Sequence, residues 1–114
     1  MNKNEFIEIL KQLGVPLNEG ESSVKNASKY PRIVFWDYSW QDKVASDDTY
    51  IALETYQVSF FSNAPRHPKL LELRDILREK GLHPTFYHEY VEEKEKNRKY
   101  YHSYFSVELG VDNG

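Results

Sequence analysis

The feature that most constrains the fold is an alternation of apolar and polar residues, with a period of two, within residues 49–62. The apolar positions are Tyr56, Val58 and Phe60. The polar positions that alternate with them are Thr55, Gln57 and Ser59. This pattern is typical of a strand that buries one face and leaves the other polar. The chain must therefore contain a sheet with at least one buried face.

Two segments have the helical period instead. Residues 2–13 and the segment that follows Pro68 each carry one apolar stripe, formed by Phe6, Ile9, Leu10 and Leu13 in the first and by Leu70, Leu73, Ile76 and Leu77 in the second. Asn2 is expected to cap the first helix, and Pro68 suits the first position of the second. Gly14 and Gly81 are expected to end the two helices because glycine accepts a left-handed backbone.

The remaining segments complete the predicted order α-β-β-α-β-β. β-rich residues predict strands over 32–38, 85–92 and 99–109, while polar residues predict a mobile loop over about 17–29 and a second loop over 39–48. A charged turn over 92–98 joins the last two strands. We therefore expect a single α+β domain over 1–114, with a mainly antiparallel sheet, two flanking helices and a long C-terminal hairpin.

The register of that hairpin predicts which residues share a face. The apolar residues of the last strand, such as Phe105, lie at odd positions, and those of the strand before it, such as Phe86, lie at even positions. For both sets to face the core, an even residue must pair with an odd one, for example with Phe86 near Phe105. The opposite face then carries Tyr87, Tyr100 and Tyr104. Two short helices can cover one face of a sheet this size but hardly two, so we expect the tyrosine face to meet another protein.

Composition narrows the function classes. The 114 residues have a net charge of −3, no cysteine and an aromatic content of 15%, with nine tyrosines. The charge balance gives no electrostatic footprint for nucleic acid or for an anionic membrane. The absence of cysteine excludes disulfides and a thiol nucleophile, and no run approaches the ~20 apolar residues of a membrane span. We expect folding in a reducing cytosol.

Candidate chemical groups do not converge. The hairpin register separates His88 and His102 onto opposite faces, which disfavours a metal site. The adjacent acids Asp47 and Asp48 would point apart on a strand, whereas acid–base catalysis needs carboxylates aimed at one point. The sequence predicts no enzyme, no cofactor and no metal.

Several stretches resemble the tail terminator family, also called tail completion, head–tail joining or minor capsid proteins, of long-tailed phages and prophages of Gram-positive bacteria. The stretches that carry the resemblance are Tyr30-Pro-Arg-Ile-Val-Phe35, Glu54-Thr-Tyr-Gln-Val-Ser-Phe-Phe-Ser62, Pro65-Arg-His-Pro-Lys-Leu-Leu-Glu-Leu73, Gly81-Leu-His-Pro-Thr-Phe86 and Tyr101-His-Ser-Tyr-Phe-Ser-Val107. The similarity covers roughly residues 1–110 and is one of pattern rather than of a catalytic motif.

The resemblance implies a homo-oligomeric ring, commonly of six subunits, at the head-proximal end of the tail tube. Such a ring stops tube polymerisation and offers a docking face for the head connector, while DNA passes through its channel without specific binding. It would belong to the virion, at the head–tail junction, after assembly in the host cytoplasm. By this resemblance, subunit contacts are expected at Tyr87, Tyr100 and Tyr104, and contacts with the tube protein or connector at Trp40, Asp47 and Asp48.

Alternatives remain open from sequence. The chain could be another small connector component, such as a stopper, or a sheet-based module that binds nucleic acid or a small ligand through exposed aromatic residues. The charged turn is either a solubilising hairpin tip or a projecting arm formed by Glu93, Lys94, Glu95 and Lys96.

Overall fold

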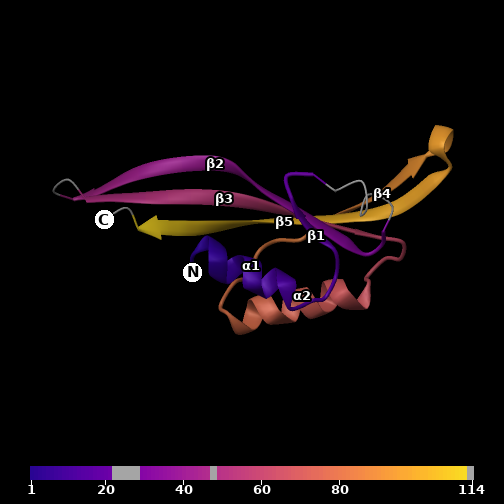
Figure 1. Ribbon diagram of the computed structural model, residues 1–114, viewed down its shortest axis with the longest axis horizontal. Helices are drawn as coiled ribbons and strands as arrows, with labels where there is room; N and C mark the ends of the chain where they lie inside the picture. Colours follow the sequence, from indigo (N-terminus) through magenta and orange to yellow (C-terminus); the bar gives the residue numbers. More distant parts are fainter. Residues whose placement is uncertain (22–28, 47–48, 113–114) are drawn as a thin grey trace.

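The computed structural model, which describes residues 1–21, 29–46 and 49–112, is an α+β fold with a five-stranded mixed sheet and two helices on one face (Figure 1). The elements are α1 (Lys3–Lys11), β1 (Leu17–Glu19), β2 (Arg32–Ser46), β3 (Thr49–Ser62), α2 (Pro68–Glu79), β4 (Tyr87–Glu93), the 3₁₀ turn η1 (Lys94–Lys96) and β5 (Arg98–Asp112). The strand order across the sheet is β1-β2-β3-β5-β4.

The strand β1 was not predicted, and the expected loop over 17–29 is wrong at its start. Leu17 pairs with Ile33 in parallel, and backbone hydrogen bonds from Ile33 N to Pro16 O and from Gly20 N to Phe35 O, both 2.8 Å, fix the pairing. A three-residue strand has no detectable period, so only its partner β2 determines it. Residues 22–28 of the expected loop lie outside the described residues.

The strand β2 is longer than predicted, and the expected loop over 39–48 is wrong from Ser39 to Ser46. These residues continue to pair with β3 beyond a register shift between Asp37 and Ser39. The polar residues in this extension have weak strand propensity, and the long neighbouring strand supplies the backbone partners that keep them extended. Asp47 and Asp48 lie outside the described residues.

Both helices form where the periodicity predicts them, with slightly shorter bounds. The Asn2 side chain accepts a hydrogen bond of 2.9 Å from the Glu5 backbone N–H, which caps α1. At α2, the His67 side chain accepts one of 3.1 Å from Lys69 N, and Pro68 occupies the first helical position as predicted. Gly14 and Gly81 both have positive φ after the helix ends. Neither helix in the described chain is long and apolar enough to cross a membrane.

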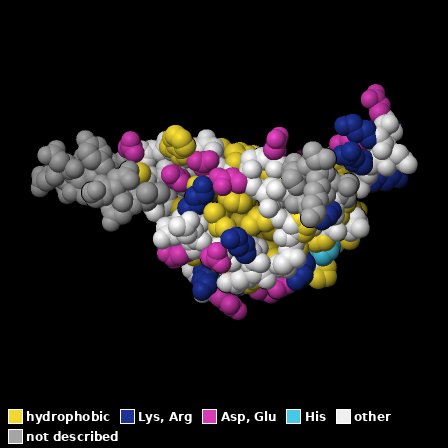
Figure 2. All heavy atoms as spheres, viewed as in Figure 1, with side chains coloured by type: hydrophobic (Ala, Val, Ile, Leu, Met, Phe, Trp, Pro, Cys, Tyr) yellow, Lys and Arg dark blue, Asp and Glu magenta, His cyan; other side chains and the backbone are white. Residues whose placement is uncertain are grey.

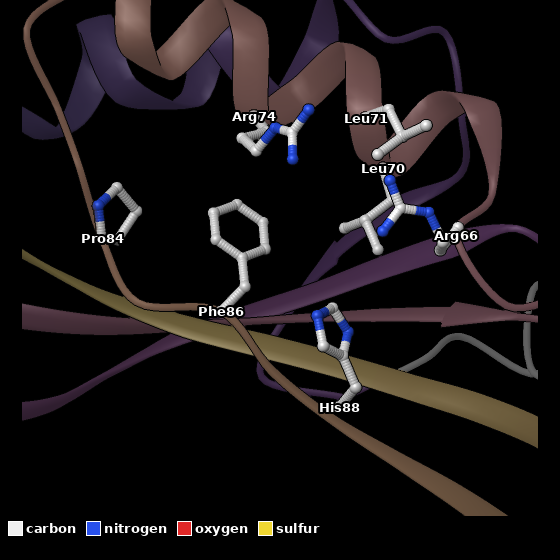
Figure 3. A pocket seen from close by; sticks show the side chains of 7 residues that line it. All are labelled: Arg66, Leu70, Leu71, Arg74, Pro84, Phe86 and His88. Carbon is white, nitrogen blue, oxygen red and sulfur yellow. The ribbon is translucent and has the colours of Figure 1, made fainter.

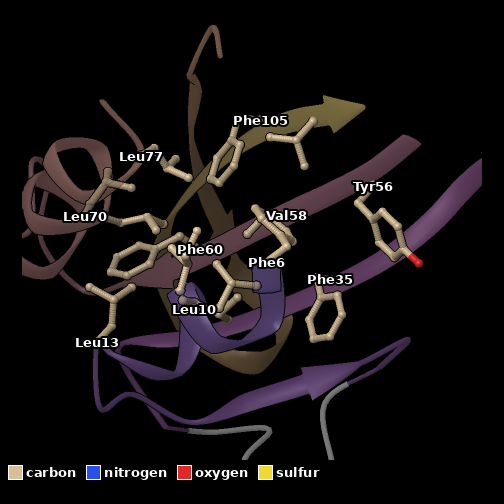
Figure 4. Packing of buried hydrophobic residues seen from close by; sticks show 14 of the residues in the cluster. Phe6, Leu10, Leu13, Phe35, Tyr56, Val58, Phe60, Leu70, Leu77 and Phe105 are labelled. Atoms are coloured by element: carbon tan, nitrogen blue, oxygen red, sulfur yellow. The ribbon is translucent and has the colours of Figure 1, made fainter. Parts of the chain in front are cut away.

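The core lies between the two helices and the facing side of the sheet (Figure 4). Phe86 stacks on Phe105 with ring centroids 4.6 Å apart, and Tyr87 pairs with Tyr104, which confirms the predicted hairpin register. The sheet contributes the fully buried side chains of Ile33, Tyr56, Val58, Phe60 and Phe105. The helices and the residues next to them contribute those of Phe6, Leu10, Leu13, Leu73 and Leu77.

The molecule is elongated because strands run beyond the helices at both ends. Figure 1 shows β2 and β3 extending from the helix-covered middle in one direction, and the β4–β5 hairpin in the other. The principal extents are 57 × 29 × 23 Å and the radius of gyration is 15.9 Å, against about 13 Å for a compact chain of this length. Both ends of the sheet therefore stand clear of the core.

Candidate functional site

The sheet face opposite the helices is the candidate functional surface, because neither helix packs on it. Register identifies its members by their alternation with core residues: Ser59 pairs with Tyr104, and Phe61 pairs with His102. Their neighbours Val58, Phe60 and Phe105 point to the core. The same alternation puts Tyr87, Glu89 and Val91 of β4 on this face. We call it the open face.

Six aromatic rings form a connected series across the open face, which we call the aromatic row. Its members in order of contact are Tyr30, Tyr100, Phe61, His102, Tyr104 and Tyr87, with successive ring centroids 6.1, 5.8, 4.7, 4.9 and 5.5 Å apart. Tyr87 has 56% of its surface exposed, and the other five side chains are half-buried. The row thus presents a wide apolar surface whose rings are already ordered by their neighbours.

Arg32 supports one end of the row. Its guanidinium carbon lies 4.9 Å from the Tyr30 ring centroid and 4.5 Å from that of Phe61. The side chain is buried and donates a hydrogen bond of 3.1 Å to the Lys29 carbonyl. A planar guanidinium on aromatic faces gains both cation–π attraction and packing. Arg32 therefore fixes two rings that come from different segments.

His102 fixes the middle of the row. Its ring stacks on Phe61 on one side and on Tyr104 on the other. Nδ1 lies 2.7 Å from Glu89 Oε1 and Nε2 lies 2.8 Å from Ser59 Oγ, so both ring nitrogens have hydrogen-bond partners. A histidine with both nitrogens engaged serves as a structural link between β3, β4 and β5.

Tyr100 joins the row to the hairpin tip. Burial, with a smaller contribution from the nearby Glu93 carboxylate, raises the pKa of the Tyr100 phenol above its ordinary value of 10.0. The hydroxyl donates to Glu93 Oε1 at 3.4 Å. Tyr100 therefore remains a neutral hydrogen-bond donor at physiological pH.

The three tyrosines that the sequence singled out all lie in the aromatic row. Tyr87 stacks on Tyr104, and Tyr100 lies farther along β5. Tyr30, Arg32 and Phe61 also belong to this surface and were not predicted from sequence, while His102 was predicted only to face away from His88. The doublet Phe60-Phe61 was an available signal, since adjacent strand residues face opposite ways and only one of the two can enter the core.

The residues expected to contact the tube or connector are placed differently. Trp40 pairs with Glu54, which itself pairs with the buried Leu109, so Trp40 faces the helix side of the sheet rather than the open face. It is 77% exposed and its indole N–H donates to the Asp37 carboxylate. Trp40 is therefore a strand residue, not a loop residue as predicted, and a second exposed aromatic site.

The residues of the charged turn form the tip of the β4–β5 hairpin. Glu93 ends β4, and Lys94, Glu95 and Lys96 make the 3₁₀ turn. Asn97 then takes a left-handed backbone, with φ 51°. Lys96 Nζ lies 4.0 Å from Glu93 Oε2, a surface ion pair of small energetic weight. The turn extends past the helices in Figure 1.

The predicted separation of the two histidines is confirmed. His88 points to the helix side, where its Nδ1 lies 2.7 Å from Ser103 Oγ, whereas His102 lies on the open face. Glu89, the nearest acid along β4, bonds His102 and not His88. Within the described residues, no group of three or more metal-binding side chains comes together.

A cleft of about 260 Å³ opens between α2 and the hairpin (Figure 3). Arg66, Leu70, Arg74, Phe86 and His88 line it. Its side chains are basic and apolar, and it is separate from the aromatic row because it lies on the helix side of the sheet. Comparison of the sequence with protein-family models and with curated proteins finds no match.

Proposed function

We propose that the chain is an assembly protein, a tail terminator that forms a ring by packing its open face against a neighbouring subunit. The aromatic row carries this proposal. Tyrosine-rich, half-exposed surfaces are typical of protein interfaces, since a large apolar ring and a polar hydroxyl both gain from contact. The sequence resemblance to tail terminators indicates which kind of assembly this surface serves.

The order already present in the row favours tight association. Each ring stacks on at least one neighbour, and Arg32 and His102 hold the row by contacts on three strands. Side chains that are fixed before binding lose little conformational entropy on binding. The free subunit would therefore present nearly the surface that the ring requires.

The elongated shape suits a ring subunit that meets other proteins at its two ends, apart from the contacts with neighbouring subunits. A closed ring needs heterologous contacts, in which two different surfaces of one subunit meet those of its neighbours. The β2–β3 extension, which carries Trp40 partway along it, and the β4–β5 tip, with residues 93–96, lie on opposite sides of the helix-covered middle. We assign them to contacts outside the open face, with the tail tube protein on one side and the head connector on the other.

A nucleic-acid module is the second candidate, because a sheet face with stacked rings can bind unpaired bases. Two observations weigh against it. Glu89 and Glu93 lie beside the row, where they would repel phosphate groups. Lys and Arg side chains are also mixed with Asp and Glu, not gathered by sign, on the face drawn in Figure 2.

The test is the solution mass across a concentration series, measured by light scattering with and without purified tail tube protein. We expect a ring-sized species of about six subunits, or capture at one tube end. Tyr104→Ala should leave the subunit folded and impair assembly, because it removes the ring that links His102 to Tyr87. Tyr90→Ala is the matched control, since Tyr90 is 51% exposed on the same hairpin but faces the other side.

Two results would count against the proposal. A strict monomer that ignores tail tubes at every concentration would exclude the ring, and would favour the binding module if single-stranded oligonucleotides bind with a steep salt dependence. Equal assembly of Tyr104→Ala and the wild type would show that the open face is not the subunit interface.

A further inference from the structure

A continuous groove runs on the helix side of the molecule, between α2 and the free edge of the sheet. The 260 Å³ cleft shares Arg66 and His88 with a second cleft of about 360 Å³ that extends along the hairpin to Tyr90 and Tyr101. We call the two together the α2–β4 groove. It lies on the opposite side of the sheet from the aromatic row, so it is not part of the proposed subunit interface.

The groove concentrates positive charge in an acidic protein. Arg66 and Arg74 line it, and Arg78 lines an adjoining cleft of about 120 Å³. These are three of the five arginines in a sequence whose net charge is −3. Glu89 is the one acid among the described lining residues of the groove, and its carboxylate bonds His102 on the other face. Among the described lining residues, no carboxylate therefore faces the two arginines, although Asp75, outside the lining, lies within ion-pair distance of Arg74.

The two arginines line the same cleft. In Figure 3 both guanidinium groups lie on the side of the cleft formed by α2 and the turn before it, across from Phe86 and His88. Arg74 Nε is buried and has no hydrogen-bond partner among the described residues. The nearest carboxylate oxygen, Asp75 Oδ1, is 3.9 Å away, beyond hydrogen-bond length. A buried donor without an acceptor is costly, so an incoming anion would satisfy a group that the fold leaves unmet.

The groove borders an unpaired strand edge. β4 is the last strand of the sheet and pairs with β5 alone among the described strands. Its outer backbone groups can accept one more strand, a common mode of peptide recognition. Alternate side chains of an added strand would then point into the groove, where Leu70 and Phe86 supply apolar wall beside the two arginines.

We propose that the α2–β4 groove binds an extended acidic segment of a partner protein, which adds to the edge of β4. One carboxylate of the segment lies between Arg66 and Arg74, and an apolar side chain two residues away contacts Phe86 and Leu70. The length of the groove along a strand edge fits a peptide better than a compact anion, and its apolar wall fits a peptide better than a phosphate backbone. This proposal does not depend on ring formation.

The test is selection of binders from a displayed library of random seven-residue peptides, the length of β4, on the full-length protein. We expect enriched peptides in which Asp or Glu alternates with apolar residues. Their affinity, measured by fluorescence anisotropy, should fall about tenfold or more in the double variant Arg66→Gln/Arg74→Gln. Methylation of alternate backbone nitrogens of the peptide should also weaken binding, because it removes donors to the β4 edge.

The control is Arg98→Gln, which removes one positive charge from the hairpin tip, outside the groove, against two in the double variant. It should bind the selected peptides as the wild type does, and an unchanged thermal midpoint shows that each variant is folded. The proposal fails if no peptide is enriched, if enriched peptides lack acids, or if the double variant binds them equally. It also fails if the double variant loses self-association or oligonucleotide binding while no peptide binds, since the groove would then belong to a second copy or to nucleic acid.

Discussion

Tyr56 is the largest fully buried side chain, and the only polar group it carries is satisfied inside the protein. Its ring contacts Phe6 and Phe35, and its hydroxyl donates to Glu54 Oε2 at 2.8 Å. Burial, reinforced by the hydrogen bond to Glu54, raises the pKa of the Tyr56 phenol well above its ordinary value of 10.0. Ionisation of this residue is therefore coupled to unfolding.

We expect stability to fall at alkaline pH and Tyr56→Phe to reduce the fall. A group whose folded pKa is raised contributes stability that is fully present below its unfolded pKa, near 10.0, and is lost as pH rises through the folded pKa. Near pH 7 the variant should lose about 0.5–1.5 kcal/mol, the typical net value of one hydrogen bond. Urea unfolding between about pH 8 and pH 11 checks both effects. If the free energy of unfolding of the variant fell as steeply at alkaline pH as that of the wild type, the coupling to Tyr56 would be contradicted. Some decline should remain in the variant, because the pKa of Tyr100 is also raised.

Residue positions on the open face could be predicted within strands, because odd- and even-numbered residues of a strand point to opposite faces. This alternation alone placed Tyr87, Tyr100 and Tyr104 together. It could not place Tyr30 or Arg32 in the row, since their contacts depend on how a non-strand segment and a strand end meet in space. His102 was assigned to the correct face, but its links to Ser59 and Glu89 follow from pairing across three strands.

At the scale of elements, α2 is attached to the sheet mainly by three leucines. Leu70, Leu73 and Leu77 are buried on one stripe, as the helical period predicted. The helix contributes little stability on its own at this length, so packing of the stripe maintains it. Glu72, Asp75 and Glu79 of the helix are exposed, and Arg74 lies beside the stripe, where it lines the groove with Leu70.

Leu73→Ala should lower the free energy of unfolding by about 2–5 kcal/mol, because it leaves a cavity at a position with no exposed surface. Leu71→Ala is the matched control. Leu71 is two positions away on the same helix and is half-buried, so the same truncation should cost less. Chemical denaturation gives both values. A silent Leu73→Ala with a destabilising Tyr104→Ala would mean that the two faces of the sheet had been assigned the wrong way round.

Elements with their own periodicity were predictable, and elements defined by a neighbour were not. Both helices and the strand β3 carry enough regular apolar positions to identify them. β1 is three residues long, and the far half of β2 is polar, so each is a strand only because an adjacent strand offers backbone partners. The mixed sheet was missed for the same reason, since the parallel pair among the described strands is the one that β1 makes with β2.

The whole molecule is more elongated than a compact domain with the same number of residues. Strands that continue past the helices give it a long axis of 57 Å, more than twice its shortest axis of 23 Å. Pairing between strands holds these ends in place without a helix layer behind them. One end carries the charged tip, so the shape separates that site from the core, whereas Trp40 lies within β2, opposite Glu54.

Small-angle scattering of the monomeric protein should give a maximum dimension near 57 Å and a radius of gyration above the ~13 Å of a compact chain. If the wild type assembles, Tyr104→Ala provides the monomer. Replacing residues 94–97 by Asn-Gly should shorten the particle and leave the thermal midpoint nearly unchanged, because the tip has no buried residue. A nearly spherical particle would contradict the extended hairpins.

The alternation along β5 has an evolutionary consequence. Phe105, Val107 and Leu109 belong to the core, while Tyr100, His102 and Tyr104 of the same strand lie on the open face. Substitutions at the outward positions can accumulate and change the partner while the inward positions are kept by selection for folding. An insertion of one residue between positions 104 and 105 would turn Phe105, Val107 and Leu109 away from the core if the pairing before it is kept. Lineages of this protein should therefore diverge by substitution along β5 and confine insertions to its two ends.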